Sequence, residues 1–93
     1  MVELKAWDSS EFLTDEETIS EYINAAMETG DPELVKVALS QAIKARGMTQ
    51  VAKEAGVPRQ SLYKALSQGG NPSLKTLNKI VVALGLRLAT VPA

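Results

Sequence analysis

The stretch TQVAKEAGVPRQSLYKAL, residues 49–66, contains the pattern that decides the fold. Its apolar residues recur at helical spacing in two short segments, and Gly56 separates these segments. Glycine reaches positive φ without steric cost, so it favours an abrupt helix end at this point. Pro58 suits the start of the second segment, because its missing N–H needs no partner in a first helical turn. The sequence therefore predicts two short helices joined by a tight corner, which is the spacing of a DNA-binding helix-turn-helix.

The polar residues of the second segment are of the types that read DNA. Arg59, Gln60 and Ser61 fall in its first turn, which in a helix-turn-helix reaches the base edges. Arginine can bind guanine, glutamine can bind adenine and serine can bond to either, whereas the later Tyr63 and Lys64 suit phosphates. Any amphipathic helix has a solvated polar face, so this assignment depends on the corner beside it. The predicted DNA-binding residues are Thr49, Gln50, Arg59, Gln60, Ser61, Tyr63, Lys64 and Asn71.

Length and composition limit the classes of protein that this chain can belong to. Its 93 residues suit one small domain with one core. The sequence contains neither cysteine nor histidine, which excludes disulfides, the usual zinc sites and the common nucleophile–base pairs. It shows no apolar run near the roughly 20 residues that span a bilayer, and no signal peptide. We therefore expect a cytoplasmic protein that is not an enzyme and has no cofactor or metal.

Charge is divided sharply between the two parts of the chain. Residues 1–33 contain ten acidic residues and one basic residue, so their net charge is −9. Residues 34–93 contain nine basic residues and one acidic residue, so their net charge is +8. Acids could simply keep a helix solvated, but the asymmetry favours a basic part that binds phosphate and an acidic part that binds something basic.

Cap and stop signals predict two helices ahead of the opening stretch. The sequence TDEE, which begins at Thr14, has the form of a capping box, and Gly30 is a stop signal, so a first helix is expected between them. Asp31 followed by Pro32 predicts the start of a second helix. That helix is expected to end at Gly47, after a basic last turn that suits the helix dipole.

Similar signals place the remaining elements. Thr49 is expected to cap the first short helix, residues 67–72 (SQGGNP) form a turn, and Ser73 begins a last helix that Gly85 ends. The alternation in residues 86–91 (LRLATV) predicts a short strand. A lone strand needs a partner, and the same strand of a second copy is the most economical one. A tail that lies over its own core is the alternative.

The chain therefore divides into an N-terminal arm, a helical domain and a C-terminal strand or tail. The arm is residues 1–13, the helical domain residues 14–85 with the helix-turn-helix at 49–66, and the tail residues 86–93. The arm holds the sole Trp and the sole Phe, each of which could pack on its own domain or anchor a partner protein. The predicted partner-binding residues are Trp7, Phe12, Asp15 and Glu16.

The run RGMTQVAKEAGVPRQSLYKALSQGGNPSLKTLNKIVVALGLRL, Arg46 to Leu88, follows an acidic helix and an aromatic-containing arm. In this it resembles the addiction-module antidote proteins of the lambda-repressor-like (Xre) helix-turn-helix superfamily, and the resemblance covers nearly the whole chain. It implies an all-α, five-helix domain in a bacterial antitoxin that neutralises a small basic RelE/ParE-like toxin by direct binding. It also implies binding to operator DNA, as a homodimer that represses its own operon. Gln50 departs from the superfamily pattern, in which the phosphate-binding Gln stands three residues before the position of Val51.

Two other function classes remain open on the sequence alone. A phage-type or chromosomal helix-turn-helix regulator without a toxin would share the basic part, and a neighbouring gene for a small basic protein would separate it from an antitoxin. An enzyme or a pure scaffold is the other class. Asp15, Glu16 and Glu17 could supply paired carboxylates, but consecutive helical residues point in different directions.

Overall fold

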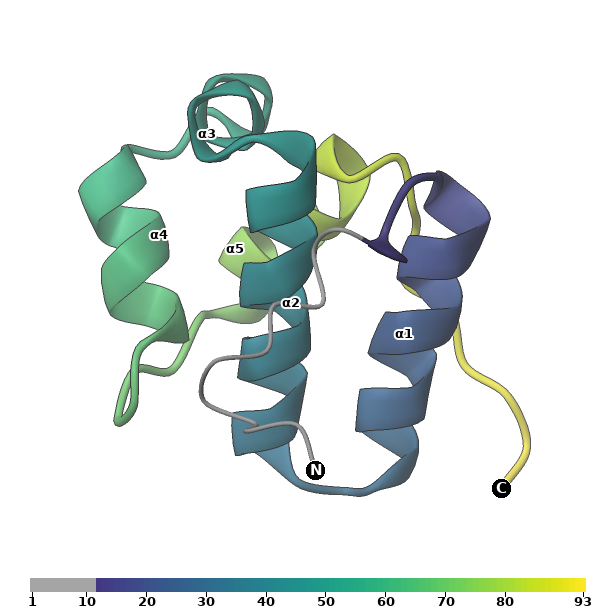
Figure 1. The fold of residues 1–93 in the computed structure, drawn as a ribbon. Helices are drawn as coiled ribbons and strands as arrows, with labels where there is room; N and C mark the ends of the chain where they lie inside the picture. Colours follow the sequence, from purple (N-terminus) through teal and green to yellow (C-terminus); the bar gives the residue numbers. More distant parts are fainter. Residues whose placement is uncertain (1–11) are drawn as a thin grey trace, which may run out of the picture.

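The computed structural model describes residues 12–93, and this part of the chain folds into five helices (Figure 1). They are α1 (Glu16–Glu28), α2 (Pro32–Arg46), α3 (Met48–Ala55), α4 (Arg59–Leu66) and α5 (Leu74–Ala83). The predicted all-α class with five helices is therefore confirmed. Within residues 12–93, no helix is long and apolar enough to cross a membrane.

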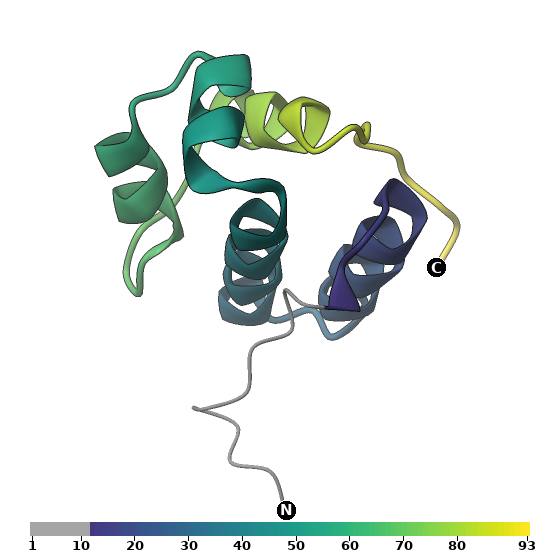
Figure 2. The ribbon, with the colours of Figure 1, turned by 45° about the horizontal axis from the view of Figure 1, so that its top comes forward.

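Helix α2 is the centre of the arrangement. Helices α1 and α4 lie on opposite sides of it in both views, α3 follows its C-terminal end, and α5 packs against α3 (Figures 1 and 2). Residues that all these helices contribute meet in one core. Its largest fully buried side chains are Leu39, Ile43, Val51, Leu62, Ile80 and Leu84. One core therefore holds the acidic helix α1 and the α3–α4 corner (residues 48–66) on a shared support.

Side-chain caps start three of the helices. Asp31 accepts from the Glu33 N–H at 2.9 Å to begin α2, and Ser73 accepts from the Thr76 N–H at 3.1 Å to begin α5, as predicted. Helix α1 starts one residue later than expected, because Asp15 and not Thr14 is its cap. Asp15 accepts from the Thr18 N–H at 2.7 Å. Its carboxylate adds a favourable interaction with the helix dipole that a threonine hydroxyl lacks.

The predicted cap at Thr49 is wrong. Helix α3 begins at Met48 directly after Gly47, and the N–H of Val51 donates to the Gly47 carbonyl at 3.0 Å. Gly47 both ends α2 and directly precedes α3. Its φ of +108° favours glycine. Thr49 therefore falls inside the first turn of α3, where it makes no side-chain cap bond.

The predicted C-terminal strand is not found. Residues 86–93 have no regular secondary structure. A ladder needs a second row of backbone groups, and the described part of this single chain has none beside the tail. The Leu86 N–H instead donates to the Val81 carbonyl at 3.0 Å and its side chain packs on the core, while Leu88 and Val91 are exposed. The alternation of apolar residues therefore does not mark a strand: Leu86 packs on the core, and the rest of the tail is exposed.

Two large apolar residues of the helices lie outside the core. Leu34 and Leu74, which fit the apolar patterns of α2 and α5, have exposed fractions of 46% and 73%. Both fall in the first turns of their helices, beyond the region where the helices meet. Periodicity gave the correct face of each helix but not the length over which that face is covered.

The cap of α1 gives a pH-dependent prediction. Donation by the Thr18 backbone N–H, aided by the Thr18 hydroxyl, lowers the pKa of Asp15 below its usual 3.8. The folded pKa is below the unfolded one, so this contribution to stability is present above about pH 3.8 and is lost as the pH falls through the folded pKa. Asp15→Asn keeps a capping oxygen without the titration, so we expect stability near that of the wild type at pH 7 and a shallower acid dependence. Urea unfolding at a series of pH values measures how the free energy of unfolding depends on pH in the wild type and in Asp15→Asn. The same dependence in both proteins would contradict the prediction.

Candidate functional site

The α3–α4 corner is held by backbone bonds and by buried side chains. Gly56 adopts the left-handed conformation that ends α3, at a φ of +67°. The next N–H, that of Val57, donates back to the Ala52 carbonyl at 3.0 Å. Leu62 on α4 is fully buried, and so is Val51 on α3. Both short helices are thus fixed to the core by their inner faces, which leaves their outer faces in a defined position.

All eight predicted DNA-binding residues are exposed. Thr49 and Gln50 lie on α3, five more lie on α4, and Asn71 lies in the loop that follows α4. Tyr63 is 57% exposed, which is high for an aromatic side chain on a helix that packs against a core. Gln50 donates from Nε2 to Oε1 of Glu54 at 2.7 Å. Its side-chain amide is therefore already hydrogen-bonded to Glu54, the single acidic residue of residues 34–93.

The N-terminal ends of α3 and α4 differ from those of the other helices. Helices α1, α2 and α5 have side-chain caps, whereas α3 and α4 have no side-chain cap and no acid in the first turn. Their first N–H groups and the positive ends of their dipoles are therefore not neutralised by a side chain. Together with nearby Lys53, Arg59 and Lys64, this gives the corner a positive outer surface that suits an anion.

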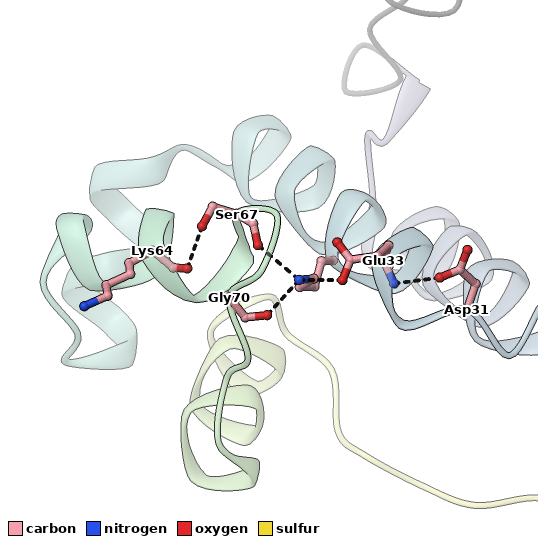
Figure 3. Close-up of polar contacts among 6 residues, drawn as sticks. Asp31, Glu33, Lys64, Ser67 and Gly70 are labelled. Atoms are coloured by element: carbon pink, nitrogen blue, oxygen red, sulfur yellow. Dashed lines mark hydrogen bonds and ion pairs between the residues drawn. The ribbon is translucent and has the colours of Figure 1, made fainter.

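Sequence reasoning missed Lys36, the buried charged residue of α2. Its Nζ donates to the carbonyl of Ser67 at 3.0 Å and to that of Gly70 at 2.7 Å, and lies 2.8 Å from Oε2 of Glu33 (Figure 3). Its side chain is 8% exposed. The available signal was its register, because Lys36 stands three residues before the buried Leu39 on the inner face of α2. A lysine at such a position needs partners, and here they come from the loop after α4.

Gly70 in that loop is required by a close approach. A Cβ on Gly70 would overlap the carbonyl oxygen of Lys64 and would lie 2.7 Å from that of Ala65. The loop therefore folds directly against the C-terminal carbonyls of α4. The Gly70 N–H donates to the Ser67 carbonyl at 2.8 Å and closes the turn.

The predicted partner-binding residues are only partly brought together. Asp15 and Glu16 are exposed at the start of α1, but the Asp15 carboxylate is occupied as the cap, and Oε2 of Glu16 lies 3.7 Å from Nη1 of Arg46. Phe12 is 56% exposed. Trp7 lies outside the described residues. In residues 12–93 there is no group of side chains that could hold a metal ion.

Helix α1 carries an acidic surface that residue-by-residue reading did not isolate. Glu17, Glu21 and Glu28 are spaced by four and seven residues, so they form one stripe, the α1 stripe, and all three are exposed. The buried Ile19 and Ile23 lie on the opposite face. Neither of the ion pairs described above involves the stripe. Helix α1 lies on the side of α2 away from α4 (Figure 1).

The family of the chain follows from its comparison with known proteins. Residues 3–92 match the model of a family described as "Probable addiction module antidote protein". The chain belongs to this family. It is also 44% identical over 85 residues to an uncharacterized protein of Haemophilus influenzae, with 91% of this chain and 88% of the relative covered. No solved structure matches the chain.

Membership of this family gives the antidote its general role. An addiction module antidote is the antitoxin of its module, so the family implies a toxin as partner. It also suggests a regulatory protein rather than an enzyme. The charge division described above therefore belongs to a protein whose role is to bind.

Proposed function

We propose that the antidote has two binding surfaces with separate roles. The α3–α4 corner acts as a lambda-repressor-like (Xre) helix-turn-helix that binds operator DNA and represses the antidote's own operon. The α1 stripe, with the acidic N-terminal arm, binds and neutralises a small basic toxin of the RelE/ParE-like class. A regulator without a toxin is the second candidate, and the family description argues against it.

The observation that carries the DNA-binding proposal is the outer surface of the corner. Exposed side chains of base-reading and phosphate-binding types lie on α3, α4 and the following loop. The N-terminal ends of both short helices lack side-chain caps, and their inner faces are buried. Such a surface offers phosphate contacts that fix orientation and, in the first turn of α4, side chains that can specify bases.

A single corner of this size makes a small contact with DNA, so we propose that a two-fold homodimer reads two half-sites about one helical turn apart. In the single chain the tail does not form the strand expected from the sequence. Sedimentation of the antidote with a one-site and a two-site operator fragment measures the stoichiometry. One chain bound with full affinity to either fragment would exclude the dimer.

The first turn of α4 gives the test of DNA reading. Arg59→Ala should weaken operator binding by about 1 to 3 kcal/mol and relax the preference at one base pair, because a bidentate contact to guanine is lost. Lys64→Ala should weaken operator and scrambled DNA alike and reduce the salt dependence, because a phosphate contact carries no sequence information. Titrations on both DNAs at several salt concentrations separate these results. Equal losses on both DNAs for both variants would remove Arg59 from its base-reading role.

A further inference from the structure

We propose that Lys36 is a positioning residue that sets how α4 is presented to DNA, although its side chain is buried and lies outside the proposed DNA-binding surface. The inference rests on the proposed DNA-binding function and adds a residue from outside the binding surface. Its ammonium has three donors and three oxygen partners, Glu33 Oε2 and the carbonyls of Ser67 and Gly70 (Figure 3). Two of these partners belong to the segment that directly follows α4.

Helix α4 is fixed at both of its ends by different means. At its start the corner bond from Val57 to Ala52 joins it to α3. At its end Lys36 joins the loop to α2, across 31 and 34 residues of sequence. The Ser67 hydroxyl in turn donates to the Lys64 carbonyl at 2.8 Å, so the bond network continues into the last turn of α4.

Without the second attachment, α4 could pivot about the corner. An eight-residue helix is about 12 Å long, so a small rotation at one end moves the other end by an ångström or more. Lys64 and Asn71 stand on either side of the loop that Lys36 holds, and both belong to the proposed DNA surface. Phosphate contacts fix the orientation in which the first turn of α4 meets the bases, and binding sites need their side chains held within about 0.5 Å. Displacement of Lys64 and Asn71 would therefore lower specificity.

Lys36 itself makes a poor DNA contact. Its side chain is 8% exposed, and Glu33 neutralises its charge at 2.8 Å. Figure 3 shows the Lys64 ammonium pointing away from the Lys36 network, toward solvent. The basic residue that can reach phosphate and the basic residue that holds the loop are therefore different residues, and substitutions can separate their effects.

The test compares Lys36→Met with Gly70→Ala. Methionine keeps the length of the side chain and removes the donors, and the alanine Cβ displaces the loop from the Lys64 carbonyl while Lys36 remains. For each folded variant, we expect the ratio of operator affinity to scrambled-DNA affinity to fall about tenfold, the size of one lost base contact. Affinity for scrambled DNA and its salt slope should stay unchanged, because Lys64 keeps its charge and exposure and non-specific binding does not require one fixed orientation of α4.

Ile23→Val is the matched control, because it trims the core in α1 and leaves α4 and its loop untouched. All chains are measured at a temperature where circular dichroism shows them folded, so that a general loss of stability does not affect the ratio. The control should keep the wild-type ratio. If Lys36→Met fails to fold, Gly70→Ala decides alone, and a wild-type ratio in any folded variant of the pair overturns the proposal. Failure of the wild type to prefer operator DNA would instead overturn the proposed function.

Discussion

Replacement of Leu62 by alanine is expected to lower the free energy of unfolding by about 2 to 5 kcal/mol, among the largest effects of any single substitution in the chain. Leu62 is fully buried on the inner face of α4 and is among the largest side chains of the core. Its truncation leaves a cavity under the helix that carries most of the proposed DNA-binding residues. Urea unfolding followed by circular dichroism measures the change.

Tyr63→Ala is the matched control for this substitution, since Tyr63 is the next residue and is 57% exposed. We expect its effect on the free energy of unfolding to stay within about 0.5 kcal/mol. Its effect on DNA affinity should exceed that of Leu62→Ala when both are measured fully folded. Similar destabilisation by the two substitutions would mean that the inner and outer faces of α4 are wrongly assigned.

Removal of the α1 stripe is expected to slow association with the toxin by about tenfold or more at low salt, since a field of one sign speeds encounter with a partner of the opposite sign. The variant is the triple change of Glu17, Glu21 and Glu28 to Gln, which keeps side-chain length and removes three charges. Stopped-flow or surface binding with the adjacent gene product measures the rate at several salt concentrations. The salt dependence should flatten together with the rate.

The stripe is a functional feature on this view because it does little for α1 itself. Glu17 in the first turn suits the positive end of the helix dipole, but Glu28 lies near the negative end and offsets it. Glu17 and Glu21 are also like charges four residues apart, which destabilises a helix slightly. Glu54→Gln, which removes the acid of the basic part, is the control and should leave association unchanged. Operator binding by the stripe variant should also be unaffected. An unaltered association rate for the stripe variant would assign toxin binding to another surface.

The helices were predictable from sequence because their signals are local. Asp31, Ser73 and Gly85 mark helix ends through bonds that span a few residues, and the structure places them as expected. Gly56 likewise defined the corner between α3 and α4. The cap of α1 was misplaced by one residue, because the neighbouring Thr14 and Asp15 could each have capped that helix. The start of α3 was misplaced by two residues, because Gly47 both ends α2 and directly precedes α3.

Other features could not be predicted because they depend on residues far apart in the sequence. The bonds from Lys36 to the loop cross more than 30 residues, and only their geometry explains why a lysine is buried in α2. The exposure of the DNA-binding candidates on α4 was predictable from the helical spacing of its apolar residues, and the structure agrees. Two hydrogen bonds also depend on side-chain positions that periodicity does not give. Gln50 donates to Glu54, and Asp15 accepts from the Thr18 N–H.

The packing of α1, which rests chiefly on α2, has a consequence for hydrogen exchange. Helices α2, α3 and α4 each pack against the other two, so none of these three can leave without disturbing the rest, and α5 is joined to them through α3. Helix α1 can detach while that group stays closed, so its amides should exchange through an opening of lower free energy than global unfolding. A partner bound to α1 would suppress this local opening, so its binding free energy would be added to the protection of the α1 amides before that of the other helices. Exchange rates along the chain would thus report occupation of the acidic surface and of the α3–α4 corner as two separate signals.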